Sequence, residues 1–485
     1  MADGQYAAEL EVVYANGNRP LVVSNPFFVD TRMPQIEVKA DQLLFSPTPG
    51  SRLPAIAIRQ SSSEEDLWEG EIQDAKGAKV RGWFWKGTAA DFSWDGKDEN
   101  GNRAPDGYYA YVVRAQTKAG NAAAKELRGI QIDTRPTPVY VTASSNGFSP
   151  NGDGVRDDIT FTTLATLKEG VKAWKVSMVS AAAGMQKEFT GTSPVPATVT
   201  WDGKDKGGLQ AAPEGSYAAV LQVEYAKGNV AEAKTAAFLL DVSAPKVDIS
   251  FEGIPFSPDN DGVNDELAIK LKVDSQVPIT SWEIVILDPA QHFFNRFSGK
   301  GAPSEKIIWN GMSETGELVE SATDYTLTFA IRDELGNAGT LTKSIPVDVL
   351  VIKEGDKYKV KIASITFVGD KADFVNVEPE KAEKNAWAIG RLAEIFKKYS
   401  QYKIRVEGHA NRVNWENKSA WAREDAELLP LSKARADAIR DALVREGIDA
   451  QRLTTAGLGA TQPVVDFGNK DNIWKNRRVE FILLR

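Results

Sequence analysis

The chain has 485 residues, of which 42% are apolar and 26% charged, and its 58 Lys and Arg face 67 Asp and Glu. This length predicts several domains, and no apolar run approaches the roughly 18 residues of a membrane-spanning helix. The net charge of −9 argues against nucleic acid as the main partner. There is no cysteine and there are only two histidines, His292 and His409, which excludes disulfide frameworks, thiol nucleophiles and Cys/His zinc sites.

The charge is distributed unevenly along the chain. Residues 351–485 hold 25 basic and 20 acidic side chains, whereas residues 1–350 hold 33 and 47. An acidic front part and a mildly basic back part predict two kinds of domain with different surfaces. The sequence opens Met1-Ala-Asp-Gly, with neither a basic nor an apolar leader segment, so no signal peptide is expected within it.

Five sequence markers recur in the same order through residues 1–350, which predicts a tandem array. A tyrosine is followed 11 residues later by Gly-Asn, then by an aspartate, by Phe-Ser-Pro and by Trp-Asp-Gly or Trp-Asn-Gly, although the last unit ends after the aspartate. Successive tyrosines lie 103, 108 and 108 residues apart, a period that fits whole small domains rather than a solenoid. They are Tyr6, Tyr109, Tyr217 and Tyr325.

Each unit is expected to be an all-β, immunoglobulin-like sandwich. Apolar residues alternate between Tyr217 and Tyr225, which is the pattern of a half-buried strand, and Gly-Asn supplies the positive-φ turn of a tight hairpin. The segment Trp-Asp-Gly-Lys-Asp, followed by Pro-Glu/Asp-Gly-x-Tyr, resembles the FlgD-type Ig-like modules of bacterial surface proteins. The tryptophans are expected in the core rather than on a binding surface; they are Trp94, Trp201 and Trp309.

These repeats divide the chain into five parts. The predicted boundaries are 1–33 for the C-terminal half of one repeat, 34–136, 137–244 and 245–350 for three complete repeats, and 351–485 for a different domain. Two strands alone cannot close a sandwich. We therefore expect the natural chain to extend upstream, with its leader removed, or residues 1–33 to pair with a neighbouring unit.

Two units open with closely similar acidic loops, at 151–158 and 259–266. Oxygen ligands at alternate positions around a glycine can wrap calcium, whereas the alternative is a turn in which Asp and Asn cap backbone amides. The first unit lacks this loop, so a metal is not general to the fold. The candidate calcium ligands are Asn151, Asp153, Asp157, Asp158, Asp259, Asp261, Asp265 and Glu266.

After Leu350 the pattern changes to alternating strands and helices. Pro379 suits the first turn of a helix that runs to about Tyr399, and Ser432 suits the N-cap of a second helix that ends at Gly447. Together these elements predict an α+β domain with the order β-α-β-α-β-β. The strands are expected at 362–367, 403–407, 452–456 and 478–483.

The segment Val-Glu-Gly-His-Ala-Asn at 406–411 resembles the Val-Glu-Gly-His-Thr-Asp segment of OmpA-like C-terminal domains. Leu-Ser-Lys-Ala-Arg-Ala at 431–436 is similar to that family's Leu-Ser-x-x-Arg-Ala helix, and Asn-Arg-Arg-Val-Glu at 476–480 is similar to its final strand. The resemblance spans about residues 355–485 and extends to MotB and the peptidoglycan-associated lipoproteins. It implies non-covalent binding of peptidoglycan stem peptides.

The resemblance also implies a binding site. A stem peptide with a diamino acid offers a carboxylate, which Arg435 can bind in a bidentate manner. It also offers an ammonium group, but the family's aspartate for that group falls at position 411, which is Asn411 here. His409 is expected to be buried behind the site, and the insertion at about 413–427 is expected to supply a substitute carboxylate or to cover the groove. The implied peptidoglycan-binding residues are Ala410, Asn411, Leu431, Arg435 and Arg478.

The sequence therefore predicts a non-catalytic protein of the periplasm or cell envelope. Its OmpA-like domain is expected to bind peptidoglycan, and its Ig-like array is expected to act as a spacer or to recruit envelope partners. The alternative is a scaffold or ligand-binding protein whose divergent domain no longer recognises standard peptidoglycan. No nucleophile elbow, phosphate loop or metal-binding histidine pair is present, which argues against an enzyme.

Overall fold

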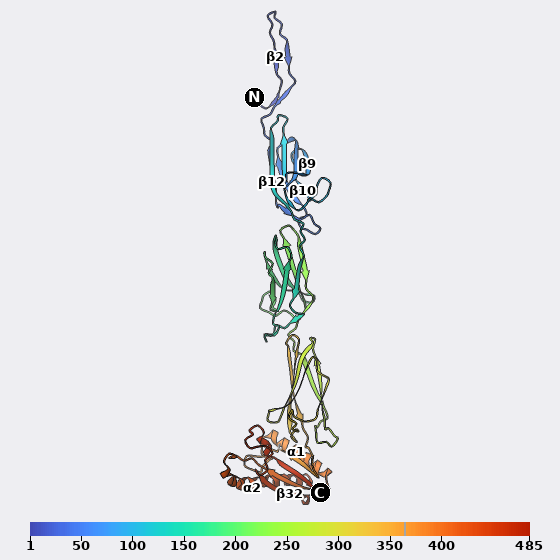
Figure 1. Cartoon of the computed structure of the whole chain (residues 1–485), viewed down its shortest axis with the longest axis vertical. Coiled ribbons are helices and arrows are strands. Elements are labelled where there is room, and N and C mark those ends of the chain that lie inside the picture. The colour runs from blue at the N-terminus through green and yellow to red at the C-terminus, as the bar shows by residue number, and fades with distance from the viewer. Residues whose placement is uncertain (363–364) are drawn as a thin grey trace. The chain divides into compact units, whose positions relative to one another are not determined.

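The computed structural model describes residues 1–362 and 365–485, and it is built mainly of β-sheets (Figure 1). By contacts the chain divides into two compact units, 1–242 and 243–485. The two α-helices of the described residues both lie after residue 350, in the part that Figure 1 colours orange and red. Neither of them is long and apolar enough to cross a membrane.

The chain begins with an exposed hairpin in which β1 (Gly4–Tyr6) pairs with β4 (Phe27–Val29), and β2 (Glu9–Glu11) pairs with β3 (Leu21–Val23). Within the described residues these strands pair with no other strand. The expectation that they pair with a neighbouring unit is therefore wrong.

The first complete sandwich packs a three-stranded sheet, β10-β7-β5, against a five-stranded sheet, β6-β12-β11-β8-β9. The long strands β11 and β12 meet at the Gly120 turn, where φ is +89°. The strand bounds are β5 Ile36–Ala40, β6 Leu44–Phe45, β7 Ile56–Ser62, β8 Glu65–Asp74, β9 Lys79–Gly87, β10 Phe92–Trp94, β11 Gly107–Gln116 and β12 Ala122–Ile132.

The second sandwich repeats this arrangement, with sheets β13-β15-β18 and β14-β21-β19-β16-β17, and β20 also pairs with β19. The strand bounds are β13 Val139–Ala143, β14 Gly147–Phe148, β15 Ile159–Ala165, β16 Val171–Ser180, β17 Gly184–Gly191, β18 Thr198–Trp201, β19 Gly215–Tyr225, β20 Val230–Lys234 and β21 Phe238–Leu240.

The third sandwich belongs to the second unit and has sheets β22-β23-β26 and β25-β24-β27-β28. The strand bounds are β22 Lys246–Glu252, β23 Leu267–Asp274, β24 Ile279–Leu287, β25 Phe293–Lys300, β26 Lys306–Trp309, β27 Asp324–Asp333 and β28 Ala338–Pro346.

Each of the three sandwiches has its own core with the same arrangement of aromatic residues. Trp94, Trp201 and Trp309 are at most 1% exposed. Their indole N–H groups donate to backbone carbonyls three residues ahead, at 2.9, 2.7 and 2.8 Å respectively. In each sandwich the repeat tyrosine lies edge-on to the tryptophan, with ring centroids 5.1, 5.2 and 6.2 Å apart. The prediction that the tryptophans belong to the core is confirmed.

The C-terminal domain has two helices and a five-stranded sheet of order β29-β30-β33-β31-β32, in which only β31 and β32 are parallel. Three short 3₁₀ helices lie at Lys418–Ala420, Ala450–Arg452 and Ile473–Asn476. The main elements are β29 Ile352–Glu354, β30 Lys357–Ile362, α1 Pro379–Lys398, β31 Lys403–His409, α2 Trp421–Arg445, β32 Leu453–Gly459 and β33 Val479–Leu484.

The predictions for this domain need two corrections. The strand expected at 362–367 ends at Ile362; residues 363–364 lie outside the described residues, and 365–367 are not in a strand. Ser432 does not cap a helix, because α2 begins at Trp421 and continues through Pro430. Ser432 is fully buried instead; its hydroxyl donates to the carbonyl of Leu429 and accepts from Gly459 N–H, which attaches α2 to β32.

Candidate functional site

A cleft of about 430 Å³ opens in the C-terminal domain, between residues 365–370, the end of β31, α2 and the start of β33. Beside this cleft α2 lies directly on the sheet. A Cβ atom on Gly408 would approach the carbonyl oxygen of Ser432 to 2.1 Å, and one on Gly457 would approach the amide nitrogen of Lys433 to 2.4 Å. The cleft brings together the five sequence-predicted residues Ala410, Asn411, Leu431, Arg435 and Arg478.

Arg435 is the cation that α2 presents to this cleft. Its Nε donates to the carbonyl of Lys371 at 3.0 Å, and its guanidinium carbon lies 4.9 Å from the centroid of the Phe367 ring. Burial lowers the pKa of Arg435, and the nearby Arg477 acts in the same direction while Asp370 opposes them. An arginine keeps its charge at neutral pH despite such a shift, so the cleft holds a fixed cation suited to a carboxylate.

Asn411 also lines the cleft, and it lies two residues after the end of β31. Its Nδ2 donates to the carbonyl of Ile473 at 2.8 Å. Its Oδ1 is buried and has no hydrogen-bond partner in the described parts of the chain, and the same is true of the indole N–H of Trp474, which also lines the cleft. Ala410 is 5% exposed and is fixed by its N–H bond to the carbonyl of Gly459.

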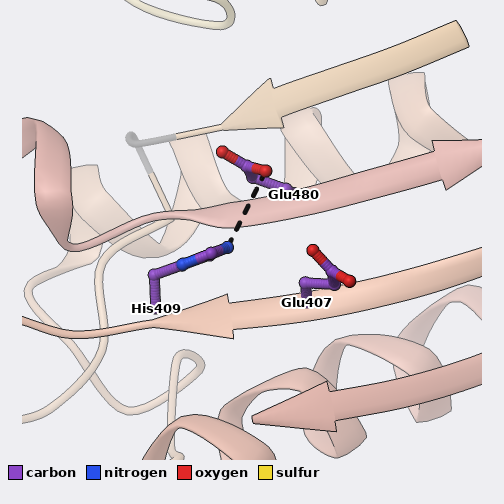
Figure 2. A group of neighbouring side chains, drawn as sticks. All are labelled: Glu407, His409 and Glu480. Atoms are coloured by element: carbon purple, nitrogen blue, oxygen red, sulfur yellow. Dashed lines mark ion pairs between the residues drawn. The ribbon is translucent and has the colours of Figure 1, made fainter. Parts of the chain in front are cut away.

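Beside the cleft lies a buried ionic cluster, which Figure 2 shows with Glu407 and His409 on β31 and Glu480 on β33. Glu480 accepts from Arg478 at 2.5 Å and from Lys359 at 2.6 Å. Although burial acts to raise the pKa of Glu480, these two cations hold it below its usual value. Arg478 is thereby oriented along the cleft wall.

His409 is 3% exposed, as the sequence predicted for a buried residue. Burial, with help from Arg478, lowers the pKa of His409 to about 4, so its imidazole is neutral at pH 7. Neither ring nitrogen has a hydrogen-bond partner within residues 1–362 and 365–485, and Nε2 lies 3.8 Å from Glu480 (Figure 2).

Glu407, His409 and Glu480 could together offer three metal-ligand atoms within 4.8 Å of one another. However, their two carboxylates already have cationic partners, since Arg405 lies 2.8 Å from Glu407 and Lys359 and Arg478 hold Glu480. A divalent ion would add its charge to these cations. The cluster is therefore explained as an ion-pair network that supports the cleft wall.

The insertion does not supply a carboxylate to the cleft. Its Glu424 and Asp425 face Arg412, with Asp425 at 2.8 Å and Glu424 at 3.9 Å. The Arg412 guanidinium also lies 4.4 Å from the ring centroid of Trp421. The insertion therefore does not supply a substitute carboxylate, because its acidic groups neutralise a buried arginine. It does not cover the groove either, because Val413 is the only one of its residues that lines the cleft.

The two acidic loops are geometrically alike. In the first, both oxygens of Asp157 accept backbone N–H groups, from Gly152 at 2.7 Å and Gly154 at 2.8 Å. In the second, Asp265 does the same for Asn260 at 2.6 Å and Gly262 at 2.8 Å. These bonds are those of the turn alternative, in which the carboxylate organises its own loop.

The second loop has an additional feature. Asp259, Asp261 and Asp265 bring carboxylate oxygens within 4.8 Å of one another. Burial, together with Asp261 and Asp265, raises the pKa of Asp259, and its Oδ1 is buried without a partner in the described structure. Calcium binding stays a prediction. The other proposed ligands are Asn151, Asp153, Asp158 and Glu266, which are exposed.

The lining residues that sequence reasoning missed include Phe367, Asp370, Trp474 and Arg477. Arg477 stands within the Asn-Arg-Arg-Val-Glu segment, so that segment could have identified it. Phe367 and Asp370 lie in a loop between β30 and α1, where neither periodicity nor a spacing rule indicates that they face α2.

The fold and the cleft define a chain of tandem β-sandwiches that ends in an α+β domain with a cationic cleft. Residues 370–477 match the OmpA family, and residues 55–119 match the FlgD Ig-like domain. The C-terminal part is therefore an OmpA-family domain, and the repeats include an Ig-like domain of the FlgD type. Both resemblances seen in the sequence are confirmed.

Several known proteins resemble part of this chain. The chain is 36% identical over 112 residues to outer membrane porin F of Pseudomonas aeruginosa, covering 23% of this chain and 29% of the porin. It is 25% identical over 119 residues to the peptidoglycan-binding protein ArfA of Mycobacterium bovis, covering 24% of this chain and 32% of ArfA. The structure of the cell wall anchor of the T6SS from Pseudomonas aeruginosa is 26% identical, with a TM-score of 0.23, and 28% of this chain covers 87% of that one. The chain thus spans less than two thirds of the two curated relatives.

Proposed function

We propose that this chain is a non-catalytic protein of the bacterial cell envelope, located in the periplasm, whose C-terminal domain binds peptidoglycan without covalent attachment. The observation that supports this proposal is the cleft, which Arg435 and Asn411 both line. The names of the relatives, a peptidoglycan-binding protein and an outer membrane porin, agree with it.

The chemistry of the cleft suits the carboxylate of a peptide stem. A guanidinium offers two parallel N–H donors to a carboxylate, and a partly buried cleft strengthens that pairing because water competes less. The backbone around the site is already held in place, since Gly408 and Gly457 pack against α2 and Ser432 ties α2 to β32. Such a rigid site loses little conformational entropy when the ligand binds.

The Ig-like array would then act as a spacer that holds the peptidoglycan-binding domain away from whatever the front of the chain contacts, or as a surface that recruits envelope partners. The three sandwiches bury their repeat tryptophans in the core, so these rings are not available to a partner. Either role leaves the cleft as the part of the chain that contacts the cell wall.

The test is co-sedimentation of the full chain with purified peptidoglycan sacculi. Arg435→Ala should weaken binding roughly tenfold or more, because the ligand carboxylate loses a charge-assisted partner. Arg423→Ala is the matched control: Arg423 lies on the same helix, its side chain is 88% exposed, and it does not line the cleft.

Equal binding by wild type and Arg435→Ala would overturn the assignment of the site. Absence of binding by the wild-type chain would favour the alternative, a scaffold whose cleft no longer recognises peptidoglycan. Circular dichroism of each variant would show that the domain remains folded.

A further inference from the structure

The cleft contains a buried, uncharged hydrogen-bond acceptor that no group of the described chain satisfies. Asn411 Oδ1 is a buried acceptor without a hydrogen-bond partner anywhere in the described residues. Leaving such an atom unpaired is unfavourable, and a ligand N–H would satisfy it. The question is which kind of N–H donor this oxygen accepts.

The orientation of the Asn411 amide follows from its other bond. Its Nδ2 donates to the carbonyl oxygen of Ile473 at 2.8 Å. In the flipped orientation Oδ1 would face that carbonyl, and two acceptors would repel each other. Oδ1 is therefore the atom left for a ligand, and Asn411 presents an uncharged acceptor.

Most of the charged groups that line the cleft are cations. Three guanidiniums line the cleft, those of Arg435, Arg477 and Arg478, whereas Asp370 is the single carboxylate among the described lining residues. Glu480 balances Arg478 by direct contact. Arg477 and Asp370 are both exposed and offset each other, and Arg435 is left to pair with the ligand's carboxylate, so the described lining offers an ammonium group no buried carboxylate.

His409 does not change this balance. It lines the same cleft, it is buried, and at neutral pH its imidazole carries no charge. A neutral amide N–H can satisfy Asn411 Oδ1 without placing a further charge in the cleft, whereas an ammonium group would be desolvated without a buried carboxylate to pair with it.

We propose that the cleft selects stem peptides in which the side-chain amine of the diamino acid is acylated, as it is in a peptide cross-link, rather than free. In this arrangement Arg435 binds the diamino acid's carboxylate and Asn411 Oδ1 accepts the neighbouring amide N–H. The inference rests on the proposed function, because it assumes that a stem peptide occupies the cleft, and it names which chemical form of the stem the cleft takes.

The experiment compares two synthetic peptides by isothermal titration calorimetry with the full chain. One is L-Ala–γ-D-Glu–meso-diaminopimelate–D-Ala with a free side-chain amine, and the other carries an acetyl-D-alanyl group on that amine. The wild-type chain should bind the acylated peptide about tenfold more tightly. Asn411→Asp should reverse the preference, because a carboxylate pairs with the ammonium group.

Asn417→Asp is the matched control. It adds the same charge to the same domain at an exposed position outside the cleft, where Asp can keep the cap that Asn417 forms with Ser419 N–H. This variant should keep the wild-type preference. Asp370→Asn is the second variant: if Asp370 held an ammonium group, its loss would weaken binding of the free-amine peptide selectively.

Three outcomes separate the inference from the proposed function. Tighter wild-type binding of the free-amine peptide would overturn the inference and leave peptidoglycan binding intact. A selective loss of free-amine binding in Asp370→Asn would also overturn it, because Asp370 would then replace the missing aspartate. Failure of both peptides to bind both wild type and Asn411→Asp would overturn the proposed function itself.

Discussion

Two hairpins with the same sequence pattern differ completely in burial. In the N-terminal hairpin, Leu10 and Val12 are 63% and 41% exposed. At the same positions of the repeat in the second sandwich, Leu221 and Val223 are fully buried. Alternating apolar residues therefore determine that a strand forms and which of its faces is apolar, but they do not by themselves create a core.

The contacts of the two hairpins explain the difference. In the second sandwich, β19 pairs with β16 on one side and with β20 and β21 on the other, and its apolar side chains share a core with those of β13, β15 and β18. The strands of the N-terminal hairpin pair only with each other within the described structure. Because a lone two-stranded hairpin is marginally stable in water, residues 1–33 should be the least protected part of the first unit.

The largest expected difference between the hairpins concerns their equivalent leucines. Leu221→Ala should reduce the free energy of unfolding of the second sandwich by about 3 kcal/mol, because it removes buried methyl groups and leaves a cavity. Leu10→Ala should change stability by less than about 0.5 kcal/mol. Hydrogen exchange of the β19 amides in urea measures the first effect locally, which suits a chain of several domains. Similar costs for both variants would show that the N-terminal hairpin is also packed in solution.

The second difference concerns the repeat aspartate, which is Asp30 after the N-terminal hairpin and Asp133 after the first complete sandwich. Asp133 is 7% exposed, and the ammonium group of Lys227, from the β19–β20 turn, donates to it at 3.1 Å and to the carbonyl of Arg135 at 2.6 Å. At the same repeat position after the N-terminal hairpin, Asp30 receives no lysine: it is bonded by Arg32, and Asn121 donates to its carbonyl.

Lys227→Met should therefore destabilise the first unit by about 2 kcal/mol, since it leaves Asp133 buried with only Arg135 to balance it. The control is Lys172→Met, which removes a surface ion pair with Glu224 and should cost less than about 0.5 kcal/mol. Urea denaturation followed by intrinsic fluorescence measures both. If Lys227→Met proves as mild as the control, the buried contact contributes nothing to stability.

The sequence was sufficient for the features that repeat. Trp201 and Tyr217 recur at fixed spacing, so the sandwich, its turns and its aromatic core were all predictable from period and composition. The start of α2 was not predictable in this way. Ser432 has the chemistry of an N-cap and follows Pro430, yet the helix continues through the proline because the tertiary contact of Ser432 with Gly459 outweighs the local signal.

The candidate site was predictable only where a motif carried it. Asn411, just after β31, and Arg435, on α2, both belong to segments that resemble the OmpA family, and both line the cleft. Trp474 and Asp370 come from loops whose path depends on long-range packing, so no local pattern could assign them. The prediction for the insertion failed for a related reason. The sequence shows that Glu424 and Asp425 are acidic, but only the fold shows that they pair with Arg412 and not with a ligand in the cleft.

The smallest expected effect is a pH dependence that distinguishes Asp133 from Asp30. Burial acts to raise the pKa of Asp133, but the hydrogen bonds from Arg135 and Lys227 outweigh it and hold the pKa at about 2. A carboxyl whose folded-state pKa is lowered contributes stability above its unfolded pKa of about 3.9, and this contribution is lost as pH falls toward 2. The wild-type chain should therefore exceed Asp133→Asn in stability by on the order of 1–2 kcal/mol at pH 6, and this advantage should disappear by about pH 2.

Asp30→Asn is the matched variant, because its carboxyl is only partly buried and its partner Arg32 is exposed and screened by solvent. Urea denaturation of the three chains at pH 6, 4 and 2.5 measures the effect as a difference from wild type, which cancels the titration of all other carboxyls. A pH-independent difference for Asp133→Asn would mean that this carboxyl titrates alike in the folded and unfolded chains. Lys227 would then not engage it, and the burial of Asp133 would have no consequence for the contact between the first and second sandwiches.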